Sequence, residues 1–350
     1  QYRRQKKLNI KLDAIKIVNV STLTGEQWLE HRQTGIGGSD ASGIAGVNKY
    51  KSKLGVFLDK KNPIVSNESP SEAAEMGHIM EPVIREVFKK RNPHLKVYQS
   101  NFMWRSIKYP FMIANVDGLI KDPQRGWGIL EIKNMSEYRL KEFGEEEIPI
   151  EFIIQGSHYM ETLNLDFCIF AVFIGGNKYR EFHLQRDDAV IDALVQIEED
   201  FWQNHILTDV APDPDGSESS GKALASMYNA EDKKPKDEIL ELPSTAKELT
   251  QAYEYYNEQE AEMKKKKDEA KQQLQSMLGV HQTAQIEGDE KKIRWTFSQS
   301  FKGDLLKEKE PDLYAQFLKP TLDAKAFQKA YPSKYKEFMV DSGKRTFNYK

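Results

Sequence analysis

Along residues 72–90, apolar residues recur at intervals of three and four, which predicts a long amphipathic helix. Its apolar positions are Met76, Ile79, Met80, Val83, Ile84, Val87 and Phe88. Pro82 lies within this stretch, so we expect a break or a new first turn there. Periodicity and helix-start residues predict further helices at about 24–33, 41–45, 54–61, 151–163 and 187–205.

Short apolar runs bounded by turn residues predict strands. The candidates are 96–104, 111–120, 127–134, 167–174 and 178–184. The run 111–120 is joined to 127–134 by KDPQRG, which is rich in turn residues and predicts a hairpin. The longest apolar run, 167–174, is far short of the roughly 20 residues that span a bilayer, so we expect no membrane segment.

The pattern changes after residue 211. Residues 212–236 are rich in Asp, Pro, Ser, Gly and Lys, which indicates a linker or a mobile loop. A charged helix is expected at about 244–278, followed by strands near 283–286 and 292–298. Apolar residues of this helix fit one heptad frame, which Glu260 and Lys267 interrupt. The helix packs either on its own domain or in an intermolecular coiled coil.

Composition supports a soluble globular protein. Of 350 residues, 39% are hydrophobic and 30% are charged, which is enough apolar surface for a core. The net charge of −3 neither predicts nor excludes nucleic-acid binding, because local fields decide it. A single cysteine excludes an internal disulfide and a cysteine-based metal site, and no secretory signal opens the chain, so we expect a cytosolic protein.

The predicted hairpin places two carboxylates opposite each other. With the turn centred near Gln124, Asp117 lies seven residues before it and Glu131 seven after it. They therefore face each other across the antiparallel pair, and Lys133 shares their face. Apposed carboxylates repel unless a cation lies between them, and Mg²⁺ or Mn²⁺ prefers such oxygen ligands. The alternative is a cross-strand salt bridge on an exposed hairpin.

Three further segments accompany the hairpin: residues 32–40 (RQTGIGGSD), 77–82 (GHIMEP) and 155–159 (QGSHY). In this order, the four resemble the YqaJ-like viral recombinase family, which includes phage lambda-type exonucleases. The resemblance covers about 25–206. It implies a restriction-endonuclease-like PD-(D/E)xK α/β core, with a mixed central sheet flanked by helices, and a C-terminal helical and β accessory module. We accordingly assign 1–210 to a nuclease domain, 211–240 to a linker and 241–350 to the accessory module.

The resemblance also implies roles for residues around the hairpin. Asp117 and Glu131 match metal-binding carboxylates, and the backbone carbonyl of Ile132 matches a further ligand. Lys133 matches the catalytic lysine. Glu81 matches an acidic residue that the helix contributes near a second metal ion.

Other matched residues lie outside the hairpin. Gln155, counted with the catalytic residues, and Tyr159 match a motif that positions the lysine, the water or the DNA. Arg32 and Ser39 match residues that hold the terminal 5′-phosphate of DNA, which suits a guanidinium beside a Gly-rich helix start. We expect Asp40 to be structural. His78 is expected to support the site, and His158 is a candidate for the same role or for a DNA contact.

The implied function is a metal-dependent 5′-to-3′ exonuclease on linear double-stranded DNA. It would use two Mg²⁺ ions, with Mn²⁺ as a possible substitute, release 5′-phosphomononucleotides and leave 3′ overhangs for recombination by strand annealing. The implied partners are DNA ends and a phage single-strand annealing protein. A homo-oligomer, trimeric by resemblance, and phage or prophage origin with action in the bacterial cytoplasm are also implied. The alternatives are an endonuclease of the same fold, restriction-like or junction-resolving, and a non-catalytic DNA-end-binding scaffold.

Overall fold

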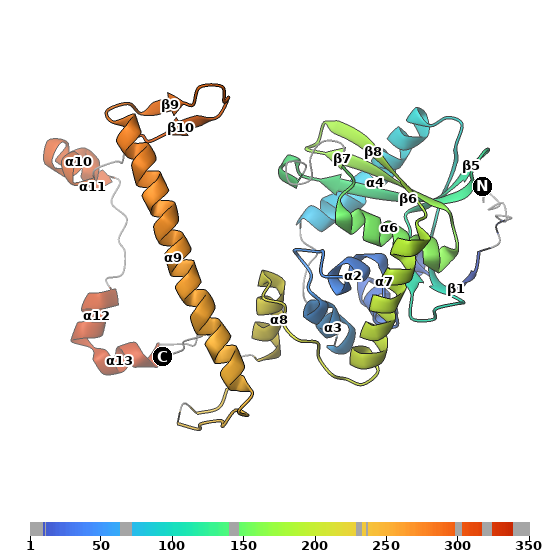
Figure 1. Cartoon of the computed structure of the whole chain (residues 1–350), viewed down its shortest axis with the longest axis horizontal. Coiled ribbons are helices and arrows are strands. Elements are labelled where there is room, and N and C mark those ends of the chain that lie inside the picture. Colours follow the sequence, from blue (N-terminus) through green and yellow to red (C-terminus); the bar gives the residue numbers. More distant parts are fainter. Residues whose placement is uncertain are drawn as a thin grey trace. The chain divides into compact units, whose positions relative to one another are not determined.

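The computed structural model describes residues 10, 12–63, 72–139, 147–228, 233–235, 237–297, 303–316 and 324–338. The chain divides into two units, and the division falls between residues 231 and 232. The described residues up to 228 belong to the first unit, and those from 233 to 338 to the second (Figure 1).

A five-stranded mixed sheet forms the centre of the first unit, as expected. Its strands, in spatial order, are β2 (Lys96–Gln99), β5 (Gly118–Asp122), β6 (Gly126–Met135), β7 (Phe167–Ile174) and β8 (Lys178–Gln185). All neighbours are antiparallel except β6 and β7, which are parallel. The parallel pair is possible because α6 (Ile150–Leu163) lies between the two strands in sequence and allows the chain to cross over.

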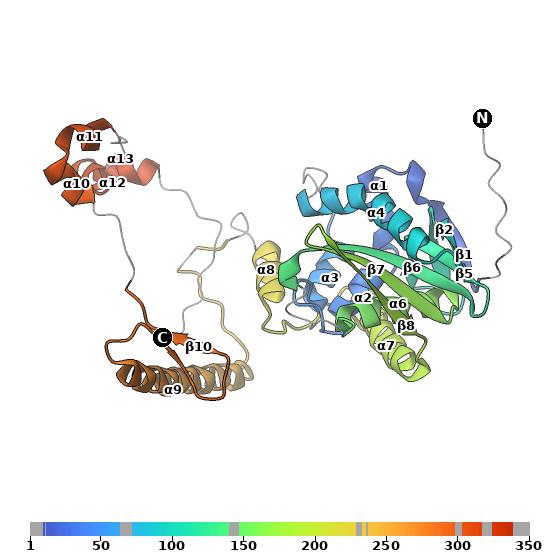
Figure 2. The same cartoon turned by 90° about the horizontal axis from the view of Figure 1, so that it is seen from above.

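Helices cover both faces of this sheet (Figure 2). On one face, α4 (Glu72–Arg91) buries Ile84 and Phe88 against Leu130 and Ile169. On the other face, α6 packs Phe152 in a stacked arrangement on Phe170, with ring centroids 4.8 Å apart. The expected α/β fold with a mixed sheet between helices is therefore confirmed, and the core lies in two layers on either side of the sheet.

Further helices that the structure describes in this unit include α1 (Gly25–Gln33), α2 (Gly38–Ile44), α3 (Lys53–Lys61), α7 (Asp188–Phe201), which a π-helical turn at Trp202–Ile206 extends, and α8 (Glu218–Met227); a 3-10 turn occupies Val20–Thr22. Thr24 begins α1 with a capping box to Gln27, as its spacing predicts. None of the described helices has the length and the apolar composition needed to cross a bilayer.

Two predicted strands each divide in two, because the chain passes from one sheet to another. The run 96–104 becomes β2 and β3 (Phe102–Ser106), and the run 111–120 becomes β4 (Ile113–Ala114) and β5. β3 pairs with β4 and with β1 (Ala14–Asn19) in a smaller antiparallel sheet. The two runs pass from one sheet to the other beside each other, where the Ser100 N–H donates a hydrogen bond to the Asp117 carbonyl.

One further expectation was wrong, and a second differs in part from the structure. The helix α4 continues through Pro82, which is exposed, so that solvent can satisfy the carbonyl whose hydrogen bond the proline removes. The expected linker 211–240 contains α8, which Ser217 caps and which buries Ala223 in the core. The Ser219 hydroxyl also accepts a hydrogen bond from the Ser52 N–H at 2.9 Å.

The second unit is built around α9 (Ala246–Leu278), which matches the helix expected at 244–278. β9 (Thr283–Gln285) and β10 (Lys292–Arg294) form a short antiparallel hairpin, shorter than the strands expected there. Residue 298, the last of the expected 292–298 strand, lies outside the described residues. Four short helices follow: α10 (Gly303–Lys309), α11 (Pro311–Gln316), α12 (Ala324–Ala330) and α13 (Pro332–Glu337).

Candidate active site

The hairpin formed by β5 and β6 has the register that the sequence predicts. Asp122 pairs with Gly126 and Gly118 with Leu130, so the turn is centred on residue 124. The same register continued one residue beyond β5 sets Asp117 opposite Glu131. Asp117 precedes β5, where the chain arrives from the smaller sheet, and its Oδ2 accepts a hydrogen bond from the Ile132 N–H at 2.7 Å.

Glu131 is almost completely buried in the middle of β6. Its Oε2 accepts hydrogen bonds from Gln155 Nε2 at 3.0 Å and from Lys133 Nζ at 3.3 Å. Its Oε1 is buried and has no hydrogen-bond partner. An unsatisfied carboxylate oxygen in this position is costly, and it marks a place where a cation fits.

Burial also changes the protonation of the two carboxyl groups. Desolvation and the nearby Asp117 raise the pKa of Glu131 to about 8, against the opposing effect of Lys133. Desolvation raises the pKa of Asp117 to about 6, and Glu81 adds to the shift while Lys133 opposes it. A divalent cation between the carboxylates would remove both effects, because it stabilises the charged form of each.

α6 supplies the residues that hold Glu131. Gln155 Nε2, which bonds Glu131, also donates to the Tyr159 hydroxyl at 3.4 Å. The start of α2 presses against both side chains: a Cβ atom at Gly38 would lie 2.7 Å from the Tyr159 ring and 2.9 Å from Gln155. The absence of a side chain at residue 38 therefore lets α2 approach α6 closely.

Glu81 lies on α4 near Asp117, and its carboxylate already pairs with a cation. It forms an ion pair with Arg85 one turn later, and Arg85 Nη2 also donates to the Asp117 carbonyl at 3.3 Å. Within the described ranges, no three His, Cys, Asp or Glu side chains gather closely enough to form a metal site unaided. His78 is exposed on the same helix. Arg85 was not a sequence candidate, although its spacing of four from Glu81 was a usable signal.

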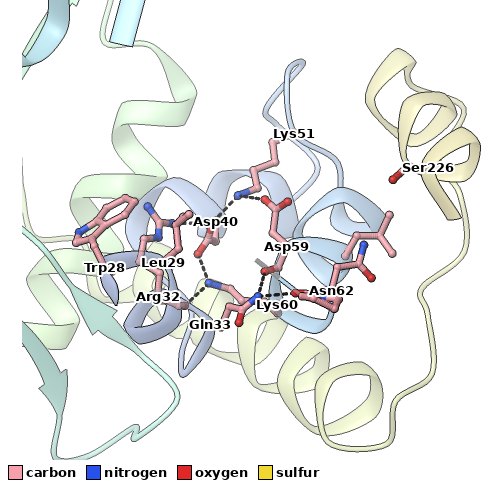
Figure 3. Close-up of a pocket in the computed structure, with 12 residues that line it drawn as sticks. Trp28, Leu29, Arg32, Gln33, Asp40, Lys51, Asp59, Lys60, Asn62 and Ser226 are labelled. Atoms are coloured by element: carbon pink, nitrogen blue, oxygen red, sulfur yellow. Dashed lines mark hydrogen bonds and ion pairs between the residues drawn. The ribbon is translucent and has the colours of Figure 1, made fainter. Parts of the chain in front are cut away.

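Arg32 and Ser39 come together at a second cluster, which we call the Asp40 pocket. Arg32 Nη2 donates to Ser39 Oγ at 3.0 Å and to Asp40 Oδ1 at 2.9 Å. Asp40 is fully buried and also accepts from Lys51 at 2.8 Å and from Lys60 at 2.6 Å (Figure 3). A cavity of about 490 Å³ opens here, with Trp28, Leu29 and Leu58 among its apolar lining residues.

The charges of the Asp40 pocket are unequal. Burial pushes the pKa of Asp40 upward, but Arg32, Lys60 and Lys51 hold it well below its usual value. Burial lowers the pKa of Lys60 to about 8, although Asp40 opposes this shift. Three cations thus face the buried Asp40 and the exposed Asp59, which pairs with Lys51 at 2.7 Å, and the remaining positive charge suits an anionic ligand.

Tyr159 lies between the Asp40 pocket and the carboxylates. Burial and Glu131 raise the pKa of Tyr159, whereas Arg32 acts in the opposite direction. Glu131 and Arg32 are therefore both near the phenol ring of Tyr159, which packs against the start of α2. Tyr159 is thus a neighbour of both clusters.

His158 does not belong to this site. It is fully buried, its Nδ1 contacts Glu198 on α7 at 2.8 Å, and its Nε2 contacts the Ile113 carbonyl at 2.9 Å. Burial lowers its pKa, but Glu198 and the Ile113 carbonyl outweigh burial and leave the pKa raised. The expectation of a DNA contact or a supporting role for His158 is replaced by a core ion pair that joins α6, α7 and β4.

This ion pair gives a stability prediction. Glu198→Gln is expected to lower the free energy of unfolding by about 3–5 kcal/mol at pH 6, because it leaves a buried imidazolium without its counter-ion. In the native chain, the ion pair of His158 contributes to the free energy of unfolding. This contribution is fully present below the unfolded pKa of histidine, about 6.5, and is lost as the pH rises through the higher pKa of His158 in the folded protein. Urea unfolding of both proteins at pH 6 and pH 9 measures the effect; an equal loss at both pH values would contradict it.

The sequence of this chain is similar to that of known proteins over the region that contains this site. Residues 27–165 match the model of the YqaJ-like viral recombinase domain. A protein of Bacillus subtilis (strain 168), named Uncharacterized protein YqaJ, is 34% identical over 303 residues, which cover 86% of this chain and 93% of the relative.

Solved structures resemble the chain more distantly. An alkaline exonuclease from Laribacter hongkongensis is 16% identical, with a TM-score of 0.42 over 58% of this chain and 100% of that one. A putative exonuclease from Eubacterium rectale is 15% identical, with a TM-score of 0.41 over 65% of this chain and 98% of that one.

Proposed function

The chain belongs to the YqaJ-like viral recombinase family, and from this premise we propose that it is a metal-dependent exonuclease that degrades linear double-stranded DNA from the 5′ end. One observation carries the proposal: Asp117 and Glu131 share a desolvated site with Lys133, and one oxygen of Glu131 has no partner. This arrangement suits a hard divalent cation better than it suits a structural salt bridge.

The donor set of the site fits such an ion. The carboxylates of Asp117 and Glu131 would hold it together with the backbone carbonyl of Ile132, and Glu81 lies near Asp117 for a second ion. When bound, Mg²⁺ or Mn²⁺ would activate a water and neutralise charge on the scissile phosphate. We propose that Mg²⁺ is the natural ion and that each active site binds two ions.

The side chains of the protein would perform the remaining tasks. Lys133 is partly exposed, with its Nζ at 3.3 Å from Glu131, so it can orient the attacking water or stabilise charge that grows on the phosphate. Gln155 keeps Glu131 in place, and Tyr159 supports Gln155. The roles proposed for these two residues are therefore positioning roles.

The Asp40 pocket would receive the terminal 5′-phosphate of the DNA. Arg32 and Ser39 already lie within hydrogen-bond distance of each other, and Lys51 adds a second cation. Because Tyr159 links this pocket to Glu131, a DNA end held at Arg32 would have its first phosphodiesters near the carboxylates. Release of 5′-phosphomononucleotides would leave a 3′ single strand.

The wider setting is proposed on the same basis. A phage single-strand annealing protein would take up the 3′ strand during recombination. A homo-oligomeric ring, trimeric in the family that the sequence resembles, would enclose the DNA and allow processive digestion without a strongly basic surface. The protein would be encoded by a phage or prophage and would act in the bacterial cytoplasm.

The test is cleavage of three DNA substrates with Mg²⁺: a linear duplex with a 5′-phosphate, the same duplex without it, and a closed circle. Loss of the phosphorylated strand with an intact circle supports the proposal. A cut circle would instead show an endonuclease, and tight end binding without cleavage would show a scaffold.

Arg32→Ala should reduce the preference for the 5′-phosphorylated duplex by roughly 10- to 100-fold, because a charge-assisted bond to the phosphate is lost. The rate ratio for the two linear duplexes measures this preference. Arg125→Ala is the control, since Arg125 pairs with Asp122 at the hairpin turn. An unchanged ratio in Arg32→Ala would remove Arg32 from phosphate recognition.

Ion binding should depend on pH. Folding raises the pKa of Asp117 to about 6 and that of Glu131 to about 8. Without a divalent ion, the free energy of unfolding therefore falls as the pH rises from about 4 to 8, because the folded chain holds protons that the unfolded chain has already released. Mg²⁺ binds the ionised forms, so the rise in melting temperature caused by Mg²⁺ should grow between pH 6 and pH 8. A rise that is equal at both pH values would contradict these assignments.

A further inference from the structure

α9 carries an exposed apolar seam that the proposed function does not use. Its positions follow one another at alternating intervals of four and three residues, the spacing of a coiled-coil core, when the charged residues Glu260 and Lys267 are counted among them. The apolar members are Leu249, Tyr253, Tyr256, Met263, Ala270, Leu274 and Met277. Leu278 is the one buried residue that the structure describes on this helix, whereas Leu249 is 74% exposed and Met277 is 82% exposed.

The seam is long enough to pair. A helix of 33 residues extends about 50 Å, and residues 249–277 cover four heptads. Helices of this length gain most of their stability from burial of an apolar face, and a sustained heptad pattern indicates that the burial occurs against another helix. The seam residues named above remain exposed among the described residues of their own unit, which leaves this face available to a helix of another chain.

The charges of α9 identify that chain. Up to residue 262, the helix has five glutamates and one lysine. From residue 263 onward, it has five lysines, four of them consecutive at 264–267, against Asp268 and Glu269. An acidic half followed by a basic half is complementary to a reversed copy of itself, and it repels a copy in the same direction.

The two polar seam positions lead to the same conclusion. In a parallel pair, Glu260 would face Glu260 of the other copy, and Lys267 would face Lys267. In an antiparallel pair that overlaps along the whole seam, the midpoint is Met263, and Glu260 lies within about one turn of Lys267 of the other copy. The residues that interrupt the heptad pattern therefore oppose a parallel pair and favour an antiparallel one.

We propose that α9 is a self-association surface through which two copies of this chain form an antiparallel coiled coil centred near Met263. The pairing is separate from any contact between nuclease units, and it does not depend on the proposed exonuclease activity. It would join two nuclease units, or two rings of them, through their C-terminal units.

The direction of pairing can be tested by disulfide formation in the full chain. Leu249→Cys and Met277→Cys are made as separate proteins with tags of different size, mixed and oxidised; the native Cys168 is buried. Disulfides between the two variants are expected, and disulfides within either variant alone are not. Gln251→Cys with Gln272→Cys is the matched control, because both residues lie on the face opposite the seam, and this pair should give no disulfide.

Other patterns would overturn the proposal. Disulfides within each variant alone would show a parallel pair, and no disulfide at all would show that α9 does not self-associate. A second measurement covers misfolding: Met263→Glu should weaken the association seen by sedimentation by roughly tenfold or more, with an unchanged circular dichroism spectrum. An unchanged association would also refute the proposal, whatever the outcome of the DNA cleavage experiments.

Discussion

Asp117→Asn is expected to reduce DNA cleavage by roughly 10³-fold or more, since it removes one of the two charges that would hold the metal ion of the proposed exonuclease. Asparagine keeps an oxygen that can accept the hydrogen bond from the Ile132 N–H, so the hairpin should stay intact. The loss of one negative charge also lowers the pKa of Glu131, whose rise depends partly on Asp117. The free energy of unfolding should therefore be unchanged or higher.

Cleavage of an end-labelled linear duplex and urea unfolding measure the two effects together. Asp166→Asn is the control, because Asp166 is exposed and precedes β7 on the same sheet. DNA binding by the Asp117→Asn protein should persist, since the Asp40 pocket is not changed. Cleavage close to that of the native protein would show that the hairpin carboxylates are not the catalytic ones.

Asp40→Asn is expected to lower the free energy of unfolding by about 3–5 kcal/mol, because it removes the buried counter-charge of Lys60, Arg32 and Lys51. Lys60 is the critical member, since it is itself buried and bonds both Asp40 and the Arg32 carbonyl. The low folded pKa of Asp40 means that this stabilisation is present above the unfolded pKa of about 4 and is lost as the pH falls through the folded value.

Urea unfolding followed by tryptophan fluorescence suits this measurement, because Trp28 lies over the Arg32 guanidinium. Asp59→Asn provides a matched comparison: Asp59 also pairs with Lys51, but its side chain is 61% exposed. Exposed ion pairs contribute about 0–1 kcal/mol, so Asp59→Asn should change little. Equal effects of the two substitutions would mean that burial does not govern the energetics of the pocket.

The hairpin of β5 and β6 and its two facing carboxylates could be predicted from sequence because all of their determinants are local. The turn residues fix the centre, and the alternation of a strand then fixes which side chains share a face. Asp117, Glu131 and Lys133 lie within 17 consecutive residues, so no tertiary information was needed to bring them together. The same holds for α1, whose capping box lies within four residues.

The Asp40 pocket could be predicted only in part. Arg32 and Ser39 belong to one recognisable segment, but Lys51 and Lys60 are contributed by the loop before α3 and by α3 itself. Their meeting at one carboxylate depends on how α2 and α3 pack, which no local pattern encodes. The division of two strands between two sheets was hidden for a similar reason, since a β run looks the same whichever sheet it joins.

The place where the two sheets meet also affects how heat inactivates the protein. Asp117 lies on the segment that joins β4 to β5, whereas Glu131 lies within the five-stranded sheet. β4 is only two residues long, but it is buried, and Ile113 also bonds the Ile36 carbonyl through its N–H and His158 through its carbonyl. Local opening of this segment would break core contacts as well as hydrogen bonds, so it should require nearly as much energy as global unfolding. Warming should therefore keep the two carboxylates together until the sheet itself unfolds, and the midpoint of thermal inactivation would then coincide with the melting temperature.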